Sequence, residues 1–208
     1  MIQINKGVEP AEWTERKSTP GFTEYEPIDE LRDALLREQY YICAYCMRRI
    51  PVKDLKIDTT SKIEHIKSRE NSPDLQLNYS NMAICCPGNL NNEPHCDNLK
   101  GSRSVSFDLY SAHLQETISY STKDGSIKSS REDWNNEMES VLNLNHSLLK
   151  LNRKNKLEGV VLAIKSTGWQ PAMVRRKFNQ WIAPNAQGKK EEYCGIVIWY
   201  LNKKIKQL

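Results

Sequence analysis

The 208-residue sequence lacks a run of about 18 apolar residues, so it predicts no membrane-spanning helix. Its opening residues, MIQINK, lack the apolar core of a secretory signal peptide. A Gly-x4-Gly-Lys-Ser/Thr loop is also absent, so we do not expect the chain to bind a nucleotide through a P-loop. Together these absences predict a cytoplasmic protein, whose cysteines serve as metal ligands rather than as disulfide partners.

Internal repeats and low-complexity segments are missing as well, and the composition, 38% hydrophobic and 27% charged, is typical of a globular protein. The net charge of +4 is unevenly distributed. Residues 1–146 carry 17 Lys and Arg against 23 Asp and Glu, whereas residues 147–208 carry 13 against 3. Such a basic C-terminal part predicts contact with nucleic acid or with an acidic partner surface. Solvated faces of ordinary helices are the alternative explanation.

The cysteines suggest a structural zinc site. Cys43 and Cys46 form a Cys-x-x-Cys turn, which is short enough to aim two sulfurs at one ion. A structural zinc needs four ligands, and the candidates for the second pair lie downstream: Cys85, Cys86, His95 and Cys96. We expect Cys86 and Cys96, which are separated by a loop rich in Gly, Pro and Asn. Ordinary buried cysteines are the alternative, and two are expected to stay outside the site: Cys85 and Cys194.

A second kind of site surrounds His65. The segment Lys62–Ile66 predicts a short strand that carries an acid, Glu64, directly before the histidine. A neutral imidazole can accept a proton from water near neutral pH, and a carboxylate can hold a hard cation. Downstream, Asn81 precedes the second cysteine pair, and Asp97 follows its last member. This combination resembles the motif of the HNH endonucleases, the zinc-stapled branch of the ββα-metal nucleases.

The resemblance implies a role for each of these residues. His65 would be the general base that deprotonates water, and Asn81 would hold the histidine and its loop in place. Asp97 and Glu64 would bind a catalytic Mg²⁺ or Mn²⁺, with Asn98 as an alternative ligand to Asp97. Two basic residues are expected to contact the phosphate of the nucleic acid: Lys100 and Arg103. The four cysteines would hold a structural zinc.

The sequence departs from the family pattern in two places. Asp97 stands where the family usually has Asn or His, and Lys67-Ser68 stands where a proline usually follows the histidine. A further difficulty is that adjacent residues of a regular strand point to opposite faces. Glu64 and His65 can therefore reach one ion only if the strand bends or ends there, and we weight His65 and Asp97 above Glu64.

The likeness extends over most of the chain and is loose after about residue 165. Segments at Lys6–Pro10, Cys43–Cys46, His95–Asp97 and Leu142–Arg153 resemble the PtuB family, the HNH nuclease subunits of Septu-type anti-phage systems, including retron-associated ones. That family implies cleavage of nucleic acid, with DNA favoured, as an effector working with a PtuA-like ATPase subunit. A retron RNA–DNA element is a further partner that it allows. Cleavage of RNA or tRNA by the same site, or a zinc module that only binds nucleic acid, are the alternatives.

The resemblance and the sequence pattern together predict an α+β protein with a ββα-metal core inside a largely helical chain. We expect an N-terminal extended segment and helix over 1–40, the nuclease core over 41–104, and a hairpin and basic helical region over 105–208. The three parts are expected to form one compact unit. Within the first part, residues 1–26 are predicted to be irregular, and a helix is predicted from Pro27 to Gln39.

The remaining segments have weaker signals and no predicted chemistry. Residues 48–58 indicate a loop with a strand. Residues 117–127 predict a hairpin, because Asp124-Gly125 is a typical two-residue turn between β-forming runs. From Arg131 onward apolar residues recur at helical spacing, and they predict a bundle of helices up to about residue 206.

Overall fold

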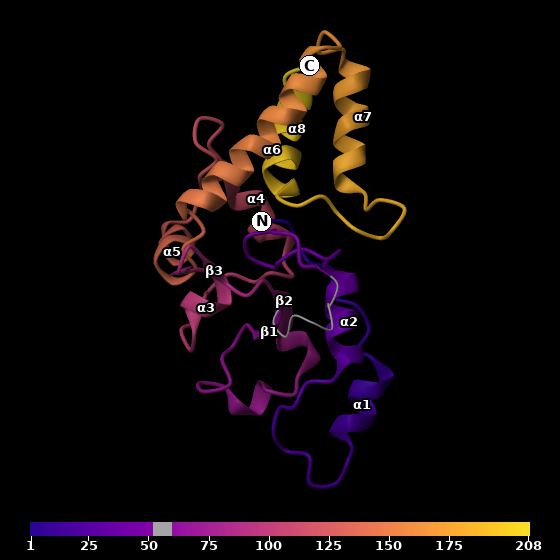
Figure 1. Cartoon of the computed structure of the whole chain (residues 1–208), viewed down its shortest axis with the longest axis vertical. Coiled ribbons are helices and arrows are strands. Elements are labelled where there is room, and N and C mark those ends of the chain that lie inside the picture. Colours follow the sequence, from indigo (N-terminus) through magenta and orange to yellow (C-terminus); the bar gives the residue numbers. More distant parts are fainter. Residues whose placement is uncertain (52–59) are drawn as a thin grey trace.

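The computed structural model describes residues 1–51 and 60–208. The C-terminal helices are α6, α7 and α8, which span Ser147–Lys165, Pro171–Ile182 and Cys194–Ile205. Figure 1 shows them together at one end of an elongated molecule, with the N-terminal helices at the other end. Most of the loop or strand predicted over 48–58 lies outside the described residues. Within the described ranges, each helix is too short or too polar to cross a bilayer.

Short strands form three two-stranded antiparallel sheets in the described chain. The strands are β1 to β6, in chain order Lys62–His65, Met82–Cys85, Asn89–Leu90, Glu93–Pro94, Ile118–Tyr120 and Ile127–Ser129. Each pairs with the next in the sequence, so β1 pairs with β2, β3 with β4 and β5 with β6. This mixture of helices and small sheets agrees with the predicted α+β class.

The sheet of β1 and β2 lies at the centre of the molecule (Figure 1). Its register places Lys62 opposite Cys85 and His65 opposite Met82. All four residues of β2 are buried, which explains why they form a continuous apolar run. The connection between the strands contains two short 3₁₀ turns, Pro73–Leu75 and Tyr79–Asn81. The five-residue helix α3, Cys96–Lys100, follows the β3–β4 hairpin.

The N-terminal part contains two helices, of which sequence patterns indicate only one. Helix α2 spans Asp29–Glu38, within the predicted range, and buries Leu31 and Leu35. The expectation that residues 1–26 are irregular throughout is wrong, because Ala11–Lys17 forms helix α1. Its only buried residue is Trp13, so it has no apolar periodicity to detect. The fixed φ of Pro10, just before it, and the acidic start and basic end favour a helix here.

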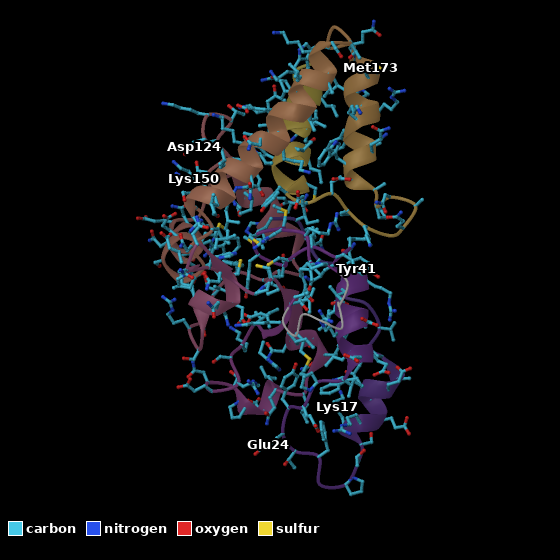
Figure 2. The ribbon with its side chains drawn as sticks, viewed as in Figure 1. Lys17, Glu24, Tyr41, Asp124, Lys150 and Met173 are labelled. Carbon is cyan, nitrogen blue, oxygen red and sulfur yellow. The ribbon has the colours of Figure 1, made fainter. Side chains whose placement is uncertain are left out.

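The predicted hairpin is confirmed by the pairing of β5 with β6. Its turn packs against the start of α6, and Figure 2 shows Asp124 beside Lys150, with a carboxylate oxygen 3.6 Å from Nζ. Gly125 has φ +76°, and a Cβ atom there would lie 2.2 Å from the carbonyl oxygen of Lys150. The buried guanidinium of Arg153 donates to the carbonyl of Gly125 at 2.6 Å. Glycine is therefore required at this turn.

The predicted helical character after Arg131 is also confirmed. Helix α4, before the hairpin, spans Ala112–Thr117, and α5, after it, spans Glu132–Asn136 and continues as a π-turn over Glu137–Val141. Helix α8 is the most deeply buried of the C-terminal helices, and α7 packs mainly on it. One cluster of buried apolar side chains runs through the described chain, from Met1 to Leu201.

Candidate functional site

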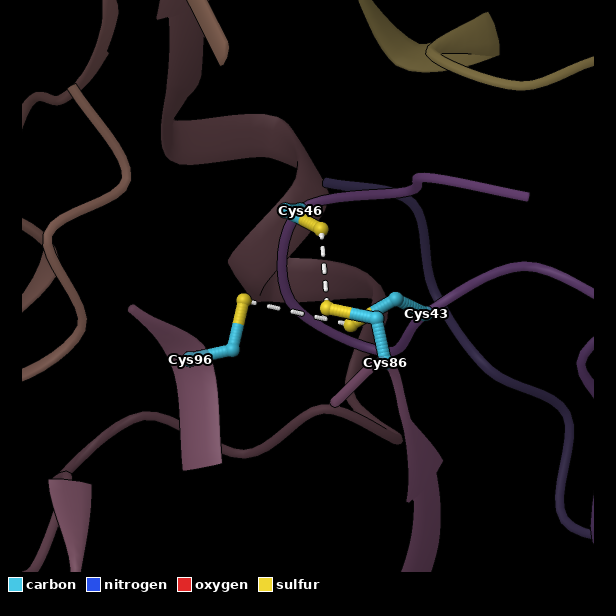
Figure 3. Close-up of side chains that lie close together, drawn as sticks. All are labelled: Cys43, Cys46, Cys86 and Cys96. Atoms are coloured by element: carbon cyan, nitrogen blue, oxygen red, sulfur yellow. Dashed lines mark hydrogen bonds between the residues drawn. The ribbon is translucent and has the colours of Figure 1, made fainter. Parts of the chain in front are cut away.

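Four cysteines that are far apart in the sequence meet at one point. Cys43 and Cys46 lie in the turn after α2, Cys86 follows β2, and Cys96 is the first residue of α3. All four sulfurs lie within 4.8 Å of one another, and Figure 3 shows them converging. The Sγ atoms of Cys43 and Cys96 are 3.9 Å apart, and those of Cys46 and Cys86 are 3.7 Å apart.

These distances fit a tetrahedral metal ion, such as zinc, rather than disulfides. A zinc–sulfur bond of about 2.3 Å in a tetrahedron separates the sulfurs by about 3.8 Å, whereas a disulfide holds them about 2.05 Å apart. All four side chains are buried, so the donor set is closed, as in structural zinc sites. Two further cysteines, Cys85 and Cys194, are buried outside this group. The cysteines chosen from the sequence are therefore the ones that the fold brings together.

The thiols also influence one another electrostatically. Burial alone raises the pKa of the Cys43 thiol, but hydrogen bonds from the neighbouring cysteines outweigh it and hold this pKa well below its usual range. Burial instead raises the pKa values of Cys46 and Cys96, so without a cation the group favours an ionised Cys43 beside protonated neighbours. A thiolate is the form that binds metal. The backbone supports this geometry, because the Cys43 amide donates to Arg48 O at 2.9 Å and the Met47 amide donates to Cys43 O at 3.0 Å. These bonds close the turn that presents the first pair of sulfurs, and the Ala44 amide ties the turn to β2 by donating to Ile84 O at 3.1 Å.

The loop between Cys86 and Cys96 depends on one glycine. Gly88 has φ +73°, and a Cβ atom there would lie 2.5 Å from His95 O and 2.7 Å from Cβ of Asn98. The His95 amide donates to Gly88 O at 2.9 Å, which closes this loop. The side chain of His95 is fully buried, and its Nε2 lies 3.6 Å from Sγ of Cys86. His95, a candidate ligand in the sequence, thus lies beside the thiol group without belonging to it.

A cleft of roughly 690 Å³ opens next to the thiol group. Its lining includes Glu64, His65 and Asp97. Adjacent residues of a strand normally face opposite sides, but β1 ends at His65, and both Glu64 and His65 reach the cleft. The condition set out from the sequence, that the strand must bend or end there, is therefore met. The structure brings all three candidate residues to one cavity.

Glu64 and Asp97 share one part of this cleft. The Glu64 side chain is only 2% exposed, and the Asp97 carboxyl lies within hydrogen-bonding distance of it. Burial, followed by the nearby Asp97, raises the pKa of Glu64 to about 8, although Lys100 opposes the shift. Two carboxyl groups this close repel each other when both are ionised, and the Lys100 ammonium beside Glu64 only partly offsets this repulsion, since the pKa of Glu64 stays raised. The pair therefore holds either a proton or a cation, and its oxygens suit a hard divalent ion.

Two side chains orient Glu64. Tyr45, inside the Cys43–Cys46 turn, donates its hydroxyl to Oε1 at 2.8 Å. Lys100, at the end of α3, places its ammonium 2.8 Å from the same oxygen. Because both contacts go to Oε1, the second oxygen of Glu64 is left for other partners. Tyr45 lies between two of the cysteines and Asp97 follows a third, so the thiol group positions both sides of the carboxylate pair.

Without added magnesium or manganese, the protein is expected to lose stability as the pH rises towards 8. Folded Glu64 keeps its proton up to a pKa of about 8, whereas the unfolded carboxyl releases it near 4.5. The folded state then binds more protons, so the free energy of unfolding falls by at most about 1.4 kcal/mol per pH unit. Thermal unfolding at several pH values measures this slope, and Glu64→Gln should flatten it. The same slope in that variant would assign the effect to another group.

His65 is held in one tautomer. Its Nε2 lies 2.9 Å from the carbonyl oxygen of Gln76, which can only accept a hydrogen bond, so Nε2 carries the proton and Nδ1 carries the lone pair. The ring of Tyr25 packs edge-on against the imidazole, with centroids 4.5 Å apart and an interplanar angle of 90°. Burial lowers the pKa of His65, which keeps it neutral at pH 7. A neutral, oriented imidazole is the form that a general base requires.

Asn81 fastens the loop that follows His65. Its Oδ1 accepts from the Lys67 amide at 2.8 Å, and its Nδ2 donates to the Lys67 carbonyl at 2.9 Å. Its own carbonyl accepts from the Ile66 amide at 2.9 Å. These contacts fix the chain immediately after the histidine, which is where the family resemblance places the asparagine.

The two residues expected to meet phosphate are placed differently. Lys100 is 1% exposed, and besides Glu64 its ammonium contacts the His65 carbonyl at 3.2 Å. Arg103 donates to the carbonyls of Lys100 and Ser140, at 3.2 Å and 3.1 Å, and also to those of Leu99 and Val141. Both side chains are committed to internal acceptors. Asn98, the alternative ligand, accepts instead from Lys62 at 3.3 Å.

Other cations, which sequence patterns did not single out, line the cleft: Arg32, Lys62 and Arg69. Arg32 is anchored, because it donates to Ser61 Oγ and Thr60 Oγ1 at 2.7 Å each. The Arg69 guanidinium lies 5.0 Å from the ring centroid of Tyr25. The only sequence signal for Lys62 and Arg69 is their closeness to His65. For Tyr25 and Arg32 there is none, because tertiary packing brings the N-terminal segment to the cleft.

Comparison with known proteins yields a distant relative. No model of a known protein family matches the chain. The chain is similar to a protein of Vibrio cholerae serotype O1 biovar El Tor that is named "Retron Vc95 putative HNH endonuclease". The two are 27% identical over 157 residues, which cover 71% of this chain and 73% of that protein.

Proposed function

We propose that the protein is a metal-dependent HNH endonuclease that hydrolyses phosphodiester bonds of nucleic acid, with DNA as the favoured polymer. The observation that carries the proposal is the convergence of His65, Glu64 and Asp97 in one cleft beside a four-thiol group. The name of the Vibrio cholerae relative supports the same class of chemistry.

In this proposal each residue of the cleft has a separate role in the reaction. Glu64 and Asp97 hold a Mg²⁺ or Mn²⁺ ion, which when bound neutralises the charge that develops on the phosphate and the leaving oxygen. His65 accepts the proton of the attacking water on Nδ1, because Nε2 is already bound to Gln76 O. Asn81 keeps the loop after the histidine in place. Lys100 and Tyr45 orient Glu64 rather than contacting substrate.

The thiol group would bind a structural zinc through Cys43, Cys46, Cys86 and Cys96. Its closed, all-sulfur donor set leaves no position for substrate, so its role is to hold α3 against the Cys43–Cys46 turn. Asp97 and Tyr45 are attached directly to these two elements. Zinc would therefore fix the distance between the two carboxylates of the cleft.

Arg32, Lys62 and Arg69 are proposed to bind the phosphates on either side of the scissile bond. Alanine at Lys62 and Arg69 together should raise KM about tenfold and leave kcat nearly unchanged, because both cations contact substrate in the ground state as well. The slope of log affinity against log salt should also become shallower, because about two fewer counterions are released on binding. The control is Lys128→Ala, an exposed lysine of β6 away from the cleft. A fall in kcat alone would contradict this role.

We further propose that the nuclease is the effector subunit of a Septu-type anti-phage complex, with a PtuA-like ATPase as its partner. The retron in the name of the relative and the charge asymmetry of the chain support a role in an assembly. A retron RNA–DNA element is a further candidate partner. Co-purification of the chain expressed with its genomic neighbours tests this, and a reproducibly solitary nuclease would contradict it.

The polymer is tested by incubating the purified protein, alone and with any co-purified ATPase, with matched DNA and RNA substrates. Preferential cleavage of DNA that requires Mg²⁺ or Mn²⁺ is the expected result. Cleavage of RNA or tRNA alone would keep the chemistry but overturn the substrate. Binding without cleavage under all conditions would favour a zinc module that only binds nucleic acid.

A further inference from the structure

A second cavity, of roughly 550 Å³, lies between the N-terminal arm, α4, β5 and α8. None of the residues that line it belongs to the lining of the carboxylate cleft. Its volume falls within the range of about 300–1,000 Å³ that is usual for small-molecule sites. Its wall combines apolar side chains with three amides, Gln3, Gln115 and Asn202, and two lysines, Lys203 and Lys206.

Two aromatic residues line this wall, Tyr120 on β5 and Trp199 on α8. The one that can act as a platform is Trp199. Its indole is partly exposed, and the ring of Tyr120 packs against it at a centroid distance of 6.0 Å and an angle of 61°. Gly195, one turn earlier, allows α8 to approach this tyrosine, since a Cβ atom there would lie 2.6 Å from its hydroxyl oxygen. The indole is thus a supported platform at the edge of a cavity, which is what stacking of a flat ligand requires.

The charges around the platform favour an anion. Lys203 Nζ lies 5.7 Å from the centroid of the Trp199 ring, and Lys206 is on the same wall. Neither lysine forms an ion pair with a residue that the structure describes, so both can turn to a ligand. The acid on this wall, Glu116, lies 3.7 Å from the ring of His113. Both lysines belong to residues 147–208, the part of the chain with the strong excess of positive charge.

We propose that this cavity binds an unpaired nucleotide of a nucleic-acid strand. Trp199 stacks on the base, Lys203 and Lys206 contact the adjacent phosphates, and Gln115 and Asn202 offer hydrogen bonds to the base edge. Alternating aromatic and cationic groups are the usual means of holding single strands, and stacking tolerates any base. A paired base in a duplex does not present its face to an indole, so the site selects unpaired segments. The site is separate from the carboxylate cleft and does not depend on cleavage.

The test measures binding of fluorescent (dT)20 to the full, zinc-loaded chain without added Mg²⁺ or Mn²⁺, so that cleavage does not interfere. Trp199→Ala should weaken binding about 5- to 150-fold, the range expected for one stacked base, whereas Trp199→Phe should keep most of the affinity. Lys203→Gln with Lys206→Gln should reduce the slope of log affinity against log salt by about 1.4, because two phosphate contacts are lost. His65→Ala should bind normally, which separates this site from the proposed nuclease.

Unchanged affinity in Trp199→Ala, with circular dichroism showing a folded protein, would overturn the proposal. If Trp199→Ala does not fold, the double variant Lys203→Gln with Lys206→Gln is the test. An unchanged slope of log affinity against log salt in that variant would also overturn the proposal. Two further results would overturn the proposal, because each would show electrostatic attraction without base stacking. One is equal affinity for a duplex of the same length, and the other is equal competition by polyglutamate of the same charge.

Discussion

His65→Ala is expected to lower the rate of nucleic-acid cleavage by about 10²- to 10⁴-fold, the usual contribution of a general base. The loss should appear in kcat, because Nδ1 of His65 is proposed to act on the attacking water and not on substrate binding. The measurement is single-turnover cleavage of a labelled DNA duplex with Mg²⁺ or Mn²⁺.

A matched control is available for this experiment. His113 lies on α4, is exposed and faces Glu116, so His113→Ala should cleave at the normal rate. The thermal stability and zinc content of His65→Ala should stay close to those of the unchanged protein, since His65 binds no thiol. Retention of more than about one tenth of the activity in His65→Ala would contradict its assignment as the base, given the range above.

Loss of the zinc proposed for the thiol group is expected to have the largest effect on stability. Structural zinc sites contribute on the order of 10 kcal/mol of binding free energy to folding, more than the net stability of many domains. Cys43→Ser and Cys96→Ser should therefore lose the metal, unfold at a much lower temperature and stop cleaving. Elemental analysis should find about one zinc per chain in the unchanged protein and almost none in these variants, because four thiolates fill one tetrahedral site.

Cys194→Ala provides the matched control, because Cys194 is equally buried but lies in α8, outside the thiol group. It should keep its zinc and most of its stability.

A separate variant tests whether the thiol group positions the cleft residues. Tyr45→Phe removes only the hydrogen bond to Glu64. It should keep the zinc and weaken Mn²⁺ binding. A folded, active protein free of zinc would contradict the role of the thiol group.

Sequence patterns predict the parts of this molecule that are locally encoded. Helix α2 has apolar residues at helical spacing, the β5–β6 hairpin has Asp124-Gly125 at its turn, and the Cys43–Cys46 turn is a local signal. The second cysteine pair also follows from spacing, because the loop between its members has the residues of a turn. In each case the information lies within a few residues of the feature it predicts.

The remaining features depend on packing between distant segments. Helix α1 has one buried residue, so no periodicity marks it. Lys100 looks like a free phosphate ligand in the sequence, but the fold buries it against Glu64, which lies on another element. Tyr25 contacts His65 only because Gln76 accepts from the Tyr25 amide at 3.3 Å and donates its side-chain amide to Thr23 O at 3.1 Å. Such contacts have no counterpart in the spacing of residues.

Glu64 and Asp97 are proposed to form one cation site that serves His65. The most direct test is titration of Mn²⁺ into the zinc-loaded protein, with DNA cleavage followed in the same samples. The account predicts one Mn²⁺ per chain and cleavage that rises with its occupancy, and it predicts that Asp97→Ala loses both. Asp74→Ala, which removes a carboxylate of the β1–β2 connection outside the cleft lining, should change neither. Normal Mn²⁺ binding and cleavage in Asp97→Ala would contradict the account.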